Sequence, residues 1–278
     1  MTKQSPSSSL VVLNPWDALK EFTDARIALG RAGSSVPTKE MLKFQLDHAQ
    51  ARDAVHLPLN SVPLYEQLKS CLENFTQASQ LFAGKPLLLN SQAHDRETYL
   101  QRPDLGRLLD ASSKAMLTIG EYDLAICVVD GLSSVAIEKN ATPFLHALFS
   151  QLQFSDNALR LAPLTVCLQG RVAIGDDVAQ QLNAKVVLVL IGERPGLSSP
   201  DSMGVYLTYN AKLGCNDAMR NCISNIRPAG LGYDMAAQKA MYLITQSQRL
   251  GLSGVNLKER SVEISSTLTN HQSFLTKQ

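Results

Sequence analysis

Three predominantly apolar runs, each closed by a polar turn that contains glycine, constrain the fold of this chain more than any other feature. The runs cover residues 124–129, 164–168 and 185–191, and the turns after them are Asp130-Gly131, Gln169-Gly170-Arg171 and Gly192-Glu193-Arg194-Pro195-Gly196. Helical spacing separates the runs, over about 133–152 and 177–182. Wholly apolar strands that alternate with helices are typical of a parallel sheet covered on both faces. The sequence therefore predicts an α/β fold with a Rossmann-like, doubly wound, mainly parallel sheet.

The remainder of the chain divides around this sheet. Residues 15–120 predict a mainly helical N-terminal region, with helices at about 19–29, 38–55 and 64–81, a short strand at 85–90 and a further helix from Arg102-Pro103. Residues 121–260 predict the Rossmann-like domain, in which 205–209 alternate like a more exposed strand and 234–250 form a closing helix. Residues 1–14 and 261–278 predict a flexible tail and a polar tail.

Composition excludes several classes of protein. The chain has 278 residues, 45% hydrophobic and 18% charged, which is typical of a globular protein. The formal net charge of +1 lacks the basic excess of a nucleic-acid or anionic-membrane binder. No apolar run approaches the roughly 20 residues that span a bilayer, and no signal peptide is evident. We therefore expect a soluble, cytoplasmic protein with no nucleic-acid or membrane partner.

The cysteines and histidines do not predict a metal site. Five scattered cysteines without a Cys-x-x-Cys pair indicate neither a disulfide framework nor a zinc knuckle. His48 and His56 are eight residues apart, which is too far for the two ligands of an i, i+4 pair on one helix.

Two enzyme motifs are present only in broken form. Gly230-Leu231-Gly232 has Met235 where a dinucleotide fingerprint needs its third glycine, and no buried strand precedes it. Gly131-Leu132-Ser133-Ser134-Val135 lies between a strand and a helix like a hydrolase nucleophile elbow, but Val135 replaces the last glycine. We interpret Ser133 as a helix N-cap. A stand-alone oxidoreductase or hydrolase remains the alternative function.

The three turns predict where a ligand binds. In open α/β sheets, ligands bind outside the carboxyl ends of the strands, and three such turns indicate a ligand larger than a small metabolite. Taken singly, each turn is equally consistent with an ordinary connection, because turns need glycine and polar residues in any case.

Six strings, in order between about Pro15 and Leu257, resemble the small (light) subunit of ethanolamine ammonia-lyase. They cover residues 30–33 (GRAG), 44–53 (FQLDHAQARD), 99–107 (YLQRPDLGR), 130–133 (DGLS), 191–202 (IGERPGLSSPDS) and 220–227 (RNCISNIR). The resemblance implies a subunit of an adenosylcobalamin-dependent lyase that converts ethanolamine to acetaldehyde and ammonia. It also implies that a large subunit holds the substrate and the radical chemistry, while this chain helps to bind cobalamin at the subunit interface.

The same resemblance places cobalamin contacts at Val172, Glu193 and Cys222 and no catalytic residue in this chain. Glu193 can accept hydrogen bonds from the corrin amides, Val172 offers an apolar contact, and Cys222 as a neutral thiol is a small, polarizable contact or simply structural. Arg194 either orients Glu193, binds an acidic group of the partner or is a solvated loop residue.

The lower face of the cofactor can also be predicted. No histidine of the chain has an aspartate two residues before it, so the Asp-x-His-x-x-Gly pattern of proteins that replace the lower base is missing. We therefore expect cobalamin to keep its own dimethylbenzimidazole on cobalt (base-on). A purely structural partner of the large subunit, and packaging in a bacterial microcompartment, are further possibilities that the sequence leaves open.

Overall fold

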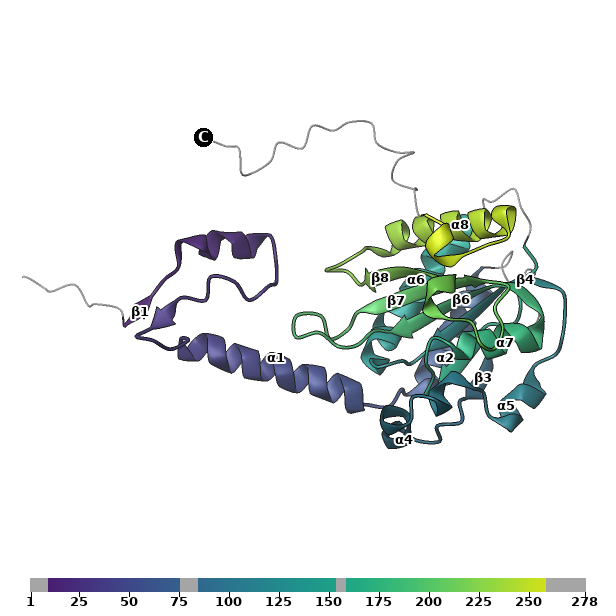
Figure 1. Ribbon diagram of the computed structural model, residues 1–278, viewed down its shortest axis with the longest axis horizontal. Helices are drawn as coiled ribbons and strands as arrows, with labels where there is room; N and C mark the ends of the chain where they lie inside the picture. Colours follow the sequence, from purple (N-terminus) through teal and green to yellow (C-terminus); the bar gives the residue numbers. More distant parts are fainter. Residues whose placement is uncertain (1–9, 76–84, 154–158, 259–278) are drawn as a thin grey trace, which may run out of the picture.

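The chain folds around a six-stranded mixed sheet. The computed structural model describes residues 10–75, 85–153 and 159–258, and the strand order is β3-β5-β4-β6-β7-β8 (Figure 1). The parallel strands are β3 (Leu87–Asn90), β5 (Thr165–Leu168), β4 (Tyr122–Val129) and β6 (Ala184–Gly192). The last two strands, β7 (Met203–Tyr209) and β8 (Arg220–Ile226), are antiparallel to their neighbours.

The α/β prediction is confirmed, but the sheet is mixed. The connections that lead into β7 and β8 contain no helix longer than the 3-10 turn η3 (Asp217–Met219). Such short connections join antiparallel strands, because a parallel neighbour needs a crossover of a dozen or more residues. The Rossmann-like, doubly wound classification remains a prediction.

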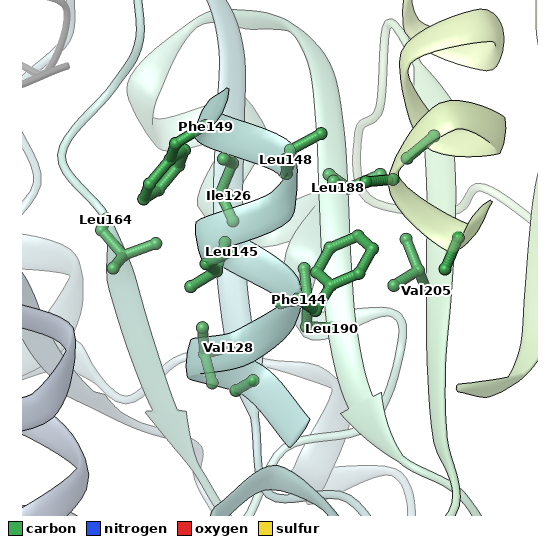
Figure 2. Close-up of a cluster of buried hydrophobic side chains, with 14 of the residues drawn as sticks. Ile126, Val128, Phe144, Leu145, Leu148, Phe149, Leu164, Leu188, Leu190 and Val205 are labelled. Carbon is green, nitrogen blue, oxygen red and sulfur yellow. The ribbon is translucent and has the colours of Figure 1, made fainter. Parts of the chain in front are cut away.

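Two hydrophobic cores lie on opposite faces of the sheet. Along β4, alternate side chains belong to different cores, with Leu124, Ile126 and Val128 in one and Ala125, Cys127 and Val129 in the other. The first core is covered by α2 (Ser61–Asn74), α6 (Ser134–Gln153) and α8 (Tyr233–Leu250). Figure 2 shows the side chains of α6 over this face. The second core is covered by α7 (Ile174–Leu182).

Most predicted elements of the sheet domain are confirmed, and two strands differ. The helices predicted at 133–152 and 234–250 are α6 and α8. The prediction of a more exposed strand at 205–209 is wrong, because β7 lies between β6 and β8 and most of it is buried. Strand β8 was not predicted, because its exposed positions Cys222, Ser224 and Asn225 include no large apolar side chain.

The N-terminal region is less helical than predicted. The helix predicted at 38–55 is α1 (Thr38–His56), but 19–29 contains only the end of the 3-10 helix η1 (Pro15–Glu21). The positive φ of Ala28 and Gly30 is incompatible with a continuing helix. Within residues 10–14, β1 (Val11–Val12) pairs with β2 (Arg31–Ala32). In Figure 1, α1 leads away from the six-stranded sheet towards this small two-stranded sheet.

The elements between α2 and β4 are short. The helix predicted at 64–81 begins earlier, as α2, and its part beyond Phe75 lies outside the described residues. No continuous helix begins at Arg102. The helix α4 (Arg96–Gln101) ends just before it, and two short elements follow, η2 (Leu105–Arg107) and α5 (Ala111–Met116). The last described element is η4 (Gly254–Asn256), and the predicted polar tail 261–278 lies outside the described part.

Two negative findings hold for the described residues. None of their helices combines the length and the apolar character needed to cross a bilayer. They also contain no group of three or more His, Cys, Asp or Glu side chains that could hold a metal ion. The five cysteines are free, and Cys127 and Cys167 are buried among apolar side chains.

Candidate functional site

A cavity of about 690 Å³ opens beside the carboxyl ends of β5 and β6. Its wall includes the turn residues Arg171 and Val172 after β5, Glu193 and Arg194 after β6, and Tyr206 on β7. The volume is in the range of small-molecule and cofactor sites, roughly 300–1,000 Å³. The site therefore lies where the sequence predicted a ligand, at the carboxyl edge of the parallel strands.

One carboxylate, that of Asp130, holds two of the three predicted turns together. Asp130 is fully buried and accepts hydrogen bonds from the backbone N–H groups of Gly131 (2.9 Å), Gln169 (2.8 Å) and Gly170 (3.0 Å). Arg96 Nη1 lies 3.8 Å from Asp130 Oδ2. Burial raises the pKa of Asp130 to about 6, although these N–H donors and Arg96 act in the opposite direction. The ends of β4 and β5 are thus fixed to each other next to the cavity.

The third turn closes against the first through backbone contacts. Leu132 N donates to Gly192 O at 3.0 Å, so the turns after β4 and β6 touch directly. A Cβ on Gly192 would lie 2.0 Å from Ser133 O and 2.6 Å from Asp130 O. The space between the ends of β4 and β6 is therefore filled, and a ligand must lie outside these strand ends.

Replacing Gly192 should separate the two turns. We expect Gly192→Ala to destabilise the protein by about 1–3 kcal/mol, because the added methyl meets backbone that cannot rotate away. A matched control is Gly232→Ala, where a Cβ would meet nothing within 4 Å and φ is −62°. Urea unfolding followed by circular dichroism measures both variants, and equal stability of the two would contradict the tight packing at Gly192.

Ser133 has the bonds of a helix N-cap. Its Oγ accepts from Ala136 N at 3.2 Å and donates to Pro200 O at 2.8 Å, and the residue is fully buried. Both roles of the hydroxyl are therefore used in holding α6 and the segment before β7. Two histidines follow Ser133 in the sequence. His146 lies within α6, and His271, the other candidate for a Ser…Asp…His order, lies outside the described residues.

Glu193 follows β6 directly, and its carboxylate is held by β8 and by the residue before β7. It accepts from Ser202 Oγ, from Ser224 Oγ at 2.5 Å and from Asn225 N at 3.2 Å. The side chain lies against Gly204, where a Cβ would come within 2.9 Å of Glu193 Oε1. No ion pair joins Arg194 to Glu193 in the described part of the chain, so serine hydroxyls and a backbone N–H, not Arg194, orient this carboxylate.

Val172 and Cys222 have different relations to the cavity. Val172 lies in the turn between β5 and α7, is half-buried and lines the cavity. Cys222 is exposed on β8 and does not line the cavity. It pairs in register with Tyr206 of β7, which does line the cavity. Desolvation raises the pKa of the Cys222 thiol, which favours the neutral form at pH 7. The structure thus brings Val172 and Glu193 to one cavity and places Cys222 beside its wall.

Sequence reasoning missed two arrangements that support this cavity. Two guanidiniums lie over the Tyr99 ring, with Arg171 Cζ 4.1 Å and Arg96 Cζ 4.7 Å from its centroid. Arg220, buried at the start of β8, forms a bidentate pair with Asp176 of α7, both N–O distances being 2.6 Å. Tyr99 and Arg220 both fall in strings that carried the family resemblance, but their partners are distant in sequence, so no local pattern joins them.

The fold and the cavity together define an α/β domain with a candidate ligand site. The candidate site lies at the carboxyl edge of the sheet, where the turns hold backbone groups and the Glu193 carboxylate around the cavity.

Comparison with known proteins identifies the family. The family model described as ethanolamine ammonia-lyase light chain (EutC) matches residues 13–258. A protein of Pseudomonas fluorescens (strain Pf0-1) is 51% identical over 256 residues, 89% of this chain and 88% of its own. One of Ralstonia nicotianae is 47% identical over 263 residues (92% and 93%), and one of Azotobacter vinelandii is 47% identical over 267 (94% and 93%). All three are named ethanolamine ammonia-lyase small subunit.

The chain therefore belongs to the ethanolamine ammonia-lyase light-chain family, whose members are subunits of a lyase.

Proposed function

We propose that this chain is the small subunit of an adenosylcobalamin-dependent ethanolamine ammonia-lyase. In this proposal the cavity holds part of a base-on cobalamin at the interface with a large subunit, which carries the ethanolamine site. The observation that carries the proposal is the fixed Glu193 carboxylate at the wall of a ligand-sized cavity, on the edge where such folds bind ligands.

The residues present fit a corrinoid. The edge of the corrin carries primary amides, whose N–H groups match the Glu193 carboxylate, and charge-assisted hydrogen bonds are the stronger kind. The cavity of about 690 Å³ suits part of so large a molecule, so a second chain must cover the remainder. The half-buried Val172 gives an apolar contact, and Cys222 an adjacent polarizable one.

The role of this chain is binding and orientation. When bound, adenosylcobalamin supplies a cobalt–carbon bond whose cleavage starts radical chemistry. Glu193 is held by Ser202, Ser224 and Asn225 before any ligand arrives, so its position requires no ordering on binding. The proposal includes a Rossmann-like, doubly wound sheet domain, a cytoplasmic location and packaging in a bacterial microcompartment.

Substitution of Glu193 tests the proposal. We expect Glu193→Ala to weaken cyanocobalamin binding by the assembled two-chain enzyme about tenfold to 100-fold, because a charged acceptor is lost. Titration of the corrin absorbance measures this affinity. Glu73→Ala, at an exposed position of α2, is the matched control and should bind as the wild type does.

Two results would contradict the proposal. One is an unchanged cyanocobalamin affinity in the Glu193→Ala complex. The other is a wild-type pair of subunits that retains no corrinoid and forms no acetaldehyde from ethanolamine when adenosylcobalamin is added.

A further inference from the structure

The cavity carries more positive charge than its own carboxylates neutralise. Its lining includes four guanidiniums and two carboxylates, namely Arg107, Arg171, Arg194 and Arg220 against Glu193 and Asp217. Arg220 is paired with Asp176 behind the wall. Within the described ranges, the other three arginines have no carboxylate within ion-pair distance, whereas several arginines elsewhere do, such as Arg26, Arg102 and Arg160.

Arg171 is held at the cavity by its own fold. Its guanidinium lies over the Tyr99 ring at 4.1 Å, Nη2 donates to Tyr99 O at 3.0 Å, and its backbone N donates to Gly106 O at 2.7 Å. A Cβ on Gly106 would lie 3.0 Å from Arg171 Cγ, so the glycine leaves room for the stem of this side chain. An ordinary surface arginine would have none of these constraints.

Two hydrogen-bond donors, one on Arg171 and one on the neighbouring Tyr99, are buried without a partner in the described structure. They are the hydroxyl of Tyr99, whose residue is fully buried, and Arg171 Nε. Both are hydrogen-bond donors in their usual state, and both belong to residues that line the cavity. The surroundings therefore suit an acceptor that carries negative charge.

We infer that Arg107, Arg171 and Arg194 bind the phosphodiester of the cobalamin nucleotide loop. This inference rests on the proposed function, and it names the part of the cofactor that these residues recognise. The phosphodiester is the anionic group of cobalamin, and the planar fork of a guanidinium matches phosphate oxygens in pairs. Glu193 then serves the amides of the ring while the arginines serve the loop, so the cavity selects complete cobalamins over corrinoids that lack the loop.

The test compares two corrinoids on the assembled two-chain enzyme. Cyanocobalamin contains the nucleotide loop, and dicyanocobinamide lacks it. We expect Arg107→Gln and Arg194→Gln, both at exposed positions, each to weaken cyanocobalamin binding about tenfold while dicyanocobinamide affinity stays within a factor of about two. Arg171→Lys keeps the positive charge but loses the planar guanidinium. It should therefore also weaken cyanocobalamin binding and leave dicyanocobinamide binding unchanged. The affinity for cobinamide phosphate, which carries a phosphate, should again fall in these arginine variants, although less than the affinity for cyanocobalamin does.

Controls separate this inference from the proposed function. Arg249→Gln, at an exposed position near the end of α8, removes a positive charge away from the cavity and should leave both affinities unchanged. If the variants lose affinity for both corrinoids equally, or for neither, the phosphodiester assignment is wrong although cobalamin binding stands. If the wild-type enzyme binds neither corrinoid, the proposed function itself has failed.

Discussion

Asp130→Ala should lower the free energy of unfolding by about 3–5 kcal/mol, because removing one partner of a buried ion pair leaves the other uncompensated. Arg96, whose side chain is 9% exposed, would lose its carboxylate, and the N–H groups of Gly131, Gln169 and Gly170 would lose their acceptor. Urea unfolding at pH 7 measures the loss. The control Asp53→Ala, with a 75% exposed side chain, should stay within about 0.5 kcal/mol of the wild type.

Asp130→Asn separates charge from shape. Either orientation of the amide turns an NH₂ group towards at least one of the three N–H donors, so this variant should also be destabilised at pH 7. The pKa of about 6 lies above the ordinary 3.8, so the folded protein binds this proton more tightly than the unfolded chain does. The proton-linked part of the contribution of Asp130 to stability is therefore full below pH 3.8 and lost as the pH rises through 6. The three N–H hydrogen bonds to the ionised carboxylate remain at pH 7.

The pH dependence provides a second measurement. Asparagine does not titrate, so the stability of Asp130→Asn should lack the part of the pH slope between about 3.8 and 6 that this carboxyl supplies to the wild type. Identical slopes in the two proteins would show that Asp130 does not titrate in this window.

Arg220→Ala should also cost about 3–5 kcal/mol, because it leaves the Asp176 carboxylate buried without its partner. The side chains of Arg220 and Asp176 are 4% and 2% exposed. The terminal nitrogens Nη1 and Nη2 of Arg220 each donate to one oxygen of Asp176 at 2.6 Å. Arg220 also donates to Thr208 Oγ1 (3.1 Å) and Cys215 O (3.0 Å), so it connects α7, β7 and the segment before β8. Thermal unfolding of the full chain measures the loss.

A double variant distinguishes the pair from simple packing. Arg220→Met combined with Asp176→Leu removes both charges, and it should be more stable than Arg220→Ala because no buried charge is left alone. A double variant as unstable as the single one would show that the loss arises from volume or from the bonds to Thr208 and Cys215 instead.

The parts of the fold that the sequence predicted are those with a strong local signal. Strands β4, β5 and β6 are buried on both faces and therefore read as continuous apolar runs. Strand β8 carries no such run, because Cys222, Ser224 and Asn225 are exposed and only every third residue is buried. The 19–29 segment has helical spacing, but its backbone takes positive φ at Ala28, and Gly30 just after it does the same, which apolar spacing alone does not reveal.

The candidate site was predictable in position but not in its contacts. The rule for the carboxyl edge of α/β sheets gave the location, and the family resemblance gave Val172, Glu193 and Cys222. Glu193 is held by Ser202 and Ser224, which are 9 and 31 residues away. Asp176 and Arg220 are 44 residues apart. Such pairs depend on how the strands lie side by side, and a single sequence carries no period that links them.

The single carboxylate of Asp130 has a consequence for how the ligand edge comes apart. Its three amide donors come from loops 40 residues apart in sequence, and the loop that contains Gly192 rests on the first of these loops. A fluctuation that frees one of these loops removes the support of the others. We therefore expect the rim of the cavity to open as a single cooperative unit, whose amides are protected from hydrogen exchange together or released together.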